Sequence, residues 1–69
     1  MLMSGSGRMA RVRYLAGTFR LVSDGDHVVC AVTSARIPLH ELRYWSVERQ
    51  EPYADAEASA EAERRASAA

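Results

Sequence analysis

The histidines and the single cysteine, His27, Cys30 and His40, are the first candidates for a metal site or a Cys-His nucleophile. Histidine and cysteine are the usual zinc ligands, and a cysteine beside a histidine forms an activated nucleophile. However, His27 and Cys30 are an odd number of positions apart, so on a strand their side chains face opposite sides. Cys30 instead shares a face with Val28 and Val32, where a free cysteine packs as a small apolar residue. We therefore expect no catalytic, cofactor or metal site, and a metal site at these three residues is the minor alternative.

Other signatures of catalysis are missing from the sequence. It contains no glycine-rich phosphate loop, no nucleophile elbow and no helical His-Glu motif. Asp24 and Asp26 lie in a Ser-Asp-Gly-Asp segment, where aspartates usually bond to their own backbone. A single cysteine excludes an intramolecular disulfide and a four-cysteine zinc site. The sequence thus predicts that the protein is not an enzyme, and a cytoplasmic location suits its one free thiol.

Arginines interleaved with aromatic residues suggest a different chemistry, the binding of single-stranded nucleic acid by charge and stacking. The net charge is zero, but residues 1–49 carry +3 and residues 50–69 carry −3. This division argues against nucleic-acid binding by the whole chain, because phosphate contacts need a net basic footprint. A local surface stays possible, and its candidate residues are Arg11, Arg13, Arg20, Arg43, Tyr44, Trp45 and Arg49. The alternative role for Trp45 is to cover the core.

Alternation of apolar and polar residues predicts three strands that position these side chains. The ranges are 11–15, 18–22 and 27–32, joined by a turn at Ala16-Gly17 and another at 23–26. Consecutive strands joined by tight turns predict a three-stranded antiparallel meander. On this sheet Arg11, Arg13 and Arg20 share one face, because side chains alternate along a strand.

The rest of the chain is predicted to cover the sheet. Residues 37–47 form a capping segment, and an alanine-rich helix runs from about Pro52 to Arg65. Alanines at every second position spread around a helix and form no apolar stripe, so we expect this helix to be exposed and frayed at its end. The predicted core consists of Tyr14, Phe19, Leu21, Val28, Cys30, Val32, Ile37, Leu42 and Trp45.

A family resemblance covers residues 14–59. The residues that carry it are Cys30-Ala31-Val32-Thr33, Ile37-Pro38-Leu39, Glu41-Leu42, Tyr44-Trp45-Ser46-Val47 and Arg49-Gln50-Glu51-x-Tyr53. In these the chain resembles domain-of-unknown-function family 2093, a family of small alphaproteobacterial proteins. Ser34 stands where the family pattern has glycine, which weakens the expectation of a tight turn at Thr33-Ser34. Pro52 stands where the pattern has alanine, which weakens the expectation of a continuous helix from Ser46.

A fainter likeness concerns the zinc finger of DksA/TraR proteins. The spacing Cys30-x-x-Thr33-x-x-x-Ile37-Pro38-x-x-x-Leu42 is similar to the first half of that finger. Carried over by position, the four ligand positions are occupied by Cys30, Thr33, Glu51 and Ala54. Three of the four thiolates are missing, so the resemblance implies a degenerate finger without zinc.

Together these observations predict an α+β protein of three parts. A disordered tail spans residues 1–10, a small β-rich domain with its capping segment spans 11–51, and the helical part spans 52–69. The function expected first is a protein-interaction or regulatory module that binds an unknown protein partner, without cofactor and without membrane. The alternatives are a nucleic-acid-binding module and the degenerate zinc-finger-like domain.

Overall fold

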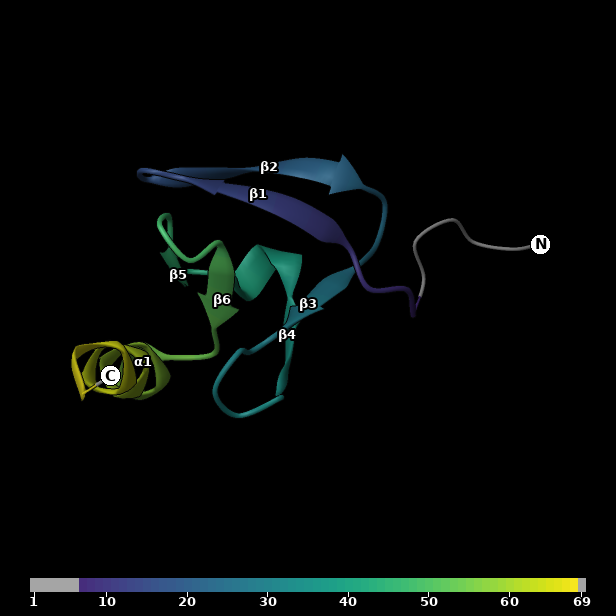
Figure 1. Cartoon of the computed structure of the whole chain (residues 1–69). Coiled ribbons are helices and arrows are strands. Elements are labelled where there is room, and N and C mark those ends of the chain that lie inside the picture. Colours follow the sequence, from purple (N-terminus) through teal and green to yellow (C-terminus); the bar gives the residue numbers. More distant parts are fainter. Residues whose placement is uncertain (1–6, 69) are drawn as a thin grey trace.

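The protein has an α+β fold, seen in a computed structural model that describes residues 7–68. Short strands make up most of the body, and one helix follows at the C-terminal end (Figure 1). The elements are β1 (Arg11–Leu15), β2 (Thr18–Ser23), β3 (His27–Val29), β4 (Arg36–Pro38), a 3-10 turn (Leu39–Glu41), β5 (Tyr44–Ser46), β6 (Glu51–Tyr53) and α1 (Ala56–Ala68).

The strands pair as three antiparallel ladders of two strands each, β1 with β2, β3 with β4, and β5 with β6. The predicted three-stranded meander is therefore wrong, because β3 pairs with β4 through Val28 opposite Ile37 and does not pair with β2. The connection before β3 explains the difference. The backbone N–H of Asp26 donates to the carbonyl of Arg8, and the Asp26 carbonyl accepts from Leu39. These bonds direct the chain away from β2.

The segment before β1 belongs to the folded body from residue 7 onward. The predicted disordered tail covers 1–10, of which residues 1–6 lie outside the described part of the chain. Met9 forms a parallel bridge with His27, and the Ala10 N–H donates to the His27 carbonyl at 2.7 Å. Ala10 is buried, and a Cβ on Gly25 would overlap its backbone. The structured region thus begins before the predicted boundary at residue 11.

The core lies between the inner side of the β1–β2 hairpin and the other two ladders. Five residues of the predicted core are buried, namely Tyr14, Val28, Cys30, Ile37 and Leu42. Phe19, Val32 and Trp45 pack against them and are partly buried. Leu21 differs from the prediction, because 45% of its surface is exposed. Within residues 7–68, β3 turns away and no strand pairs with the free edge of β2, so Leu21 is left partly uncovered.

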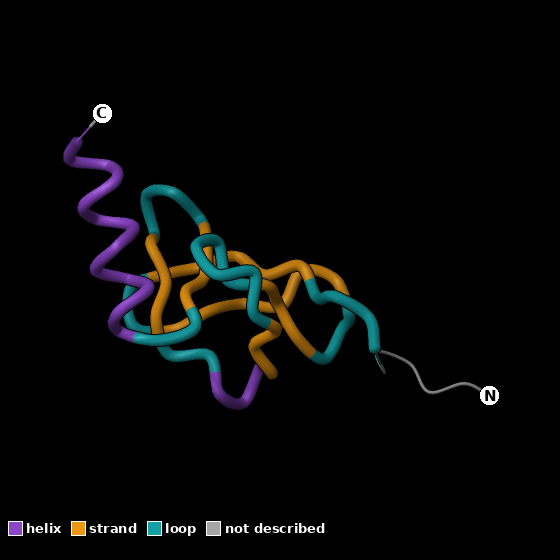
Figure 2. The backbone as a smooth tube through the Cα atoms, turned by 90° about the horizontal axis from the view of Figure 1, so that it is seen from below, coloured by secondary structure: helices purple, strands orange, loops and turns teal. Residues whose placement is uncertain are grey.

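The helix differs from the prediction at its start and in its packing. Pro52 lies in β6, and α1 begins at Ala56, where the Asp55 carboxylate accepts the N–H of Ala58 at 2.8 Å as an N-cap. Ala58 and Ala62, one helical turn apart, are buried where α1 contacts β5 and β6. The helix therefore packs through Ala58 and Ala62 along one side of the body (Figure 2).

Candidate functional site

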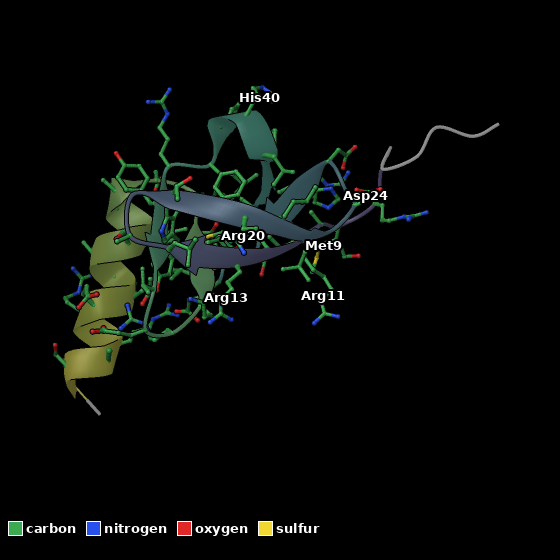
Figure 3. The ribbon with its side chains drawn as sticks, turned by 90° about the horizontal axis from the view of Figure 1, so that it is seen from above. Met9, Arg11, Arg13, Arg20, Asp24 and His40 are labelled. Carbon is green, nitrogen blue, oxygen red and sulfur yellow. The ribbon has the colours of Figure 1, made fainter. Side chains whose placement is uncertain are left out.

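The β1–β2 hairpin separates its side chains onto two faces. Tyr14 pairs with Phe19 on the inner face, and Arg13 pairs with Arg20 on the outer face. Arg11 stands near the end of the same ladder, where a bulge shifts the register. Figure 3 shows that all three arginines are carried by this hairpin, whereas His40 lies on the 3-10 turn. We call the outer surface formed by Arg11, Arg13 and Arg20 the arginine face.

The arginine face lowers the stability of the isolated protein. Arg13 and Arg20 stand directly opposite each other across the ladder, and like charges in this arrangement are destabilising. All three arginines are exposed. Within residues 7–68, the carboxylates that form ion pairs are bound to other basic residues and leave the arginine face unneutralised. Among the described residues, the arginine face is therefore a row of positive charges without carboxylate partners.

Trp45 lies on the opposite side of the hairpin from the arginine face. Its indole Nε1 donates to the Leu15 carbonyl at 2.8 Å, and its ring meets Phe19 edge to face, with 5.7 Å between ring centroids. The ring of Tyr14 lies 6.0 Å away on the same inner face. Trp45 thus ties β5 to the underside of the hairpin, and it is not placed to stack a base beside the arginines.

The remaining residues of the predicted binding surface, Arg43, Tyr44 and Arg49, are not part of the arginine face either. Arg43 and Tyr44 are exposed next to Trp45. Arg49 donates to the Tyr53 hydroxyl and to the Glu63 carboxylate, both at 3.0 Å. These hydrogen bonds raise the pKa of Arg49 above its usual value. The seven predicted residues therefore do not converge on one surface, and Arg49 is a structural link between β6 and α1.

Gln50 is a structural residue that the sequence did not reveal. Its side-chain amide accepts the Tyr14 N–H at 2.9 Å and donates to the Tyr14 carbonyl at 2.8 Å. The same amide nitrogen donates to the Val47 carbonyl at 2.7 Å. Gln50 therefore binds the free edge of β1 in the way that a neighbouring strand would. Its φ is positive, at 53°, which is unusual for a residue other than glycine, but a backbone angle cannot be read from the sequence.

The edge of β2 is open. Tyr14 uses both backbone polar groups to bind Gln50, so these groups point away from β2. In an antiparallel ladder the residue directly opposite, Phe19, then points its N–H and carbonyl away from β1, and Leu21 does the same two positions on. Within the described residues, no other segment forms a backbone hydrogen bond with β2. Leu21 and Val22 beside this edge are 45% and 61% exposed.

Cys30 sits in a tight turn rather than at the end of a strand. The Cys30 sulfur accepts the N–H groups of Val32 and Thr33 at 3.4 and 3.3 Å. Ser34 follows with φ 66°, so it adopts the conformation that favours glycine and the tight turn forms without one. Burial alone would raise the pKa of the Cys30 thiol, but hydrogen bonds from Thr33, Val32 and Ala54 outweigh burial and lower it.

The three residues considered for a metal site do not come together. His27 is buried and its Nδ1 lies 2.7 Å from the Asp26 carboxylate, while the His40 side chain is 81% exposed. In the part of the chain that the structure describes, no three His, Cys, Asp or Glu side chains are close enough to share a metal ion. The Cys30 sulfur instead accepts backbone N–H groups of its own turn.

Comparison with known proteins gives one match. Residues 21–62 match the model of a family described as "Uncharacterized protein conserved in bacteria (DUF2093)", a range that covers more than half of the 69 residues. No curated protein and no solved structure matches the chain. Among the described residues, no helix has both the length and the apolar character needed to cross a membrane.

Proposed function

The chain belongs to this bacterial family, DUF2093, and we propose that it is a non-catalytic protein-interaction module whose contact surface is the β1–β2 hairpin. The observation that carries the proposal is the arginine face, which has no carboxylate partner within the described chain, and the same hairpin exposes Leu21 and Val22 along its β2 edge. Arginine is enriched at protein interfaces, and the buried centre of an interface is more apolar than the surrounding surface.

The hairpin is a better contact surface than the helix. A helix that docks in a partner's groove needs a free apolar face. The apolar face of α1 is occupied, because Ala58 and Ala62 are buried against the body and Arg49 binds Glu63. The hairpin, in contrast, presents its outer face and one edge without rearrangement. This favours a partner that binds the folded protein without changing its conformation.

A protein partner is favoured over nucleic acid by the position of Trp45. Binding of single strands combines a basic groove with aromatic rings on which bases stack. Here the Trp45 indole is bound to the Leu15 carbonyl on the inner side of the hairpin, away from the arginine face. An arginine face without neighbouring aromatic rings suits carboxylates, which arginine binds with two parallel hydrogen bonds.

The test is a capture experiment with the tagged, full-length protein in bacterial lysate, with and without nuclease. We compare wild type with the double variant Arg13→Glu and Arg20→Glu, and with a control that carries the same charge change at Arg36 and Arg43, both exposed and outside the hairpin. A nuclease-resistant partner that is lost only in the hairpin variant supports the proposal. Partners that disappear with nuclease would establish the nucleic-acid alternative, and equal capture by all three proteins would refute the hairpin as the contact surface.

A further inference from the structure

The two edges of the β1–β2 hairpin differ in the hydrogen bonds that the rest of the molecule makes to them. The edge of β1 is covered at Tyr14, because Gln50 binds both backbone groups of this residue. The edge of β2 exposes the backbone groups of Phe19 and Leu21. Folded proteins usually protect a free edge with proline, lysine, inward-pointing charge or a covering segment. β2 has six residues, its bulge at Val22 lies near its end, beyond Phe19 and Leu21, and its one charged side chain, Arg20, points outward.

We infer that β2 accepts an extended acidic segment of a partner protein as an additional antiparallel strand. The inference rests on the proposed function and specifies how that contact is made. The backbone groups of Phe19 and Leu21 would form the hydrogen bonds, as in other cases of strand addition. The arginine face defines the partner's chemistry, because residues directly opposite on an antiparallel pair share a face.

The pattern of the incoming strand follows from this geometry. Its residues opposite Phe19 and Leu21 lie over the inner face, where apolar side chains would cover the exposed part of Leu21. Its alternate residues lie beside Arg20 and near Arg13, where carboxylates would neutralise the facing arginines. The partner segment therefore alternates apolar and acidic residues over about five positions.

A second copy of this chain fits the same edge less well. The free groups of Phe19 and Leu21 allow a symmetric antiparallel pair in which Phe19 meets Phe19, Phe19 meets Leu21, or Leu21 meets Leu21. In each of these registers, Arg20 and the Arg20 of the partner subunit stand directly opposite or diagonal on one face. Like charges at these positions are destabilising, and Arg13 on the neighbouring strand adds to the repulsion. Charge thus favours an acidic strand over self-association.

The probe is a blocked peptide of sequence Val-Glu-Val-Glu-Val, titrated into the full-length 15N-labelled protein and followed by NMR. We expect the amide resonances of Phe19 and Leu21 to shift and their hydrogen exchange to slow. A peptide with lysine in place of glutamate should bind at least about tenfold more weakly, because each charge pair changes from attraction to repulsion. Methylating the central valine nitrogen should abolish binding, whereas methylating a glutamate nitrogen, which faces solvent, should not.

Two variants test the edge in the protein itself. Leu21→Pro removes an N–H that points to solvent, a position where an edge strand tolerates proline, and it should abolish peptide binding while Trp45 fluorescence stays native. If this variant does not fold, Arg13→Glu with Arg20→Glu should weaken binding by about tenfold or more.

Two outcomes of the peptide titration would overturn the inference. One is equal binding of the glutamate and lysine peptides, and the other is unchanged Phe19 and Leu21 amides at about 1 mM peptide, a concentration that detects even weak complexes. If the peptide fails but capture from lysate still requires Arg13 and Arg20, the hairpin remains the contact surface and strand addition is refuted. Formation of a dimer through β2 would establish a second copy as the occupant instead.

Discussion

Gln50 should stabilise the fold through three hydrogen bonds that its side chain makes to backbone groups. Two go to Tyr14, 36 positions away in the sequence, and one goes to Val47. Each such bond contributes about 0.5–1.5 kcal/mol net, and partial exposure reduces the sum to roughly 1–2 kcal/mol. A domain of this size has only about 3–5 kcal/mol in total. Loss of this one side chain should therefore remove a large part of the stability.

The informative variants are Gln50→Met and Gln50→Glu. Both keep the length of the side chain and the positive φ at this position, so the backbone strain is the same in each. Methionine loses all three hydrogen bonds. Glutamate still accepts the Tyr14 N–H, but it loses both donors and places a negative charge against the carbonyls of Tyr14 and Val47. Gln50→Glu should therefore be the less stable of the two at pH 7, and it should recover relative to wild type below about pH 4, where the carboxyl group gains a proton.

Urea unfolding followed by Trp45 fluorescence measures these effects, because the Trp45 indole binds the residue next to Tyr14. With a slope of about 1 kcal/mol/M, Gln50→Met should lower the midpoint by about 1–2 M. Glu48→Met is the matched control, since Glu48 is an exposed neighbour of the same turn and should leave the midpoint unchanged. An equal midpoint for Gln50→Met and wild type would refute the view that this amide replaces a strand.

Three further predictions concern other contacts. Gly25→Ala should destabilise the protein by about 1–3 kcal/mol, because the new Cβ overlaps the Ala10 backbone; an unchanged thermal midpoint would contradict this. Ala62→Glu should release α1 from the body by a similar free energy, detected as faster proteolysis of the helix, whereas Ala66→Glu on an exposed position should not. Hydrogen bonds from His27 and the Gly7 N–H lower the pKa of Asp26, so its contribution is present above about pH 3.9 and is lost as the pH falls through the folded pKa. Asp26→Asn should thus flatten the loss of stability in acid, and an identical pH profile would argue against it.

Local patterns in the sequence were sufficient to predict the β1–β2 hairpin and which side chains lie on each of its two faces. Alternation over 11–22 and the glycine at position 17, which has φ 79°, specify two strands joined by a tight turn. The same alternation predicts that Arg13 and Arg20 share a face and that Tyr14 lies on the other. Period-two arguments need only neighbouring residues, because the pleat of a strand determines where each side chain points.

Contacts between distant residues were decided by the tertiary structure alone. The partner of β3 depends on bonds that Asp26 makes to Arg8 and Leu39, and no local pattern encodes them. Tyr53 is the most buried residue of the core at 1% exposure, yet the proline before it suggested a helix start rather than a strand.

The open edge that defines the proposed contact also depends on long-range structure. It is open because β3 turns away from β2, and the opposite edge is covered at Tyr14 because Gln50 reaches this residue from 36 positions along the chain. The sequence by itself determined which side chains face outward on the hairpin, since that depends on local geometry. Which backbone edge stays free was decided only by packing, because a strand's neighbours come from anywhere in the chain.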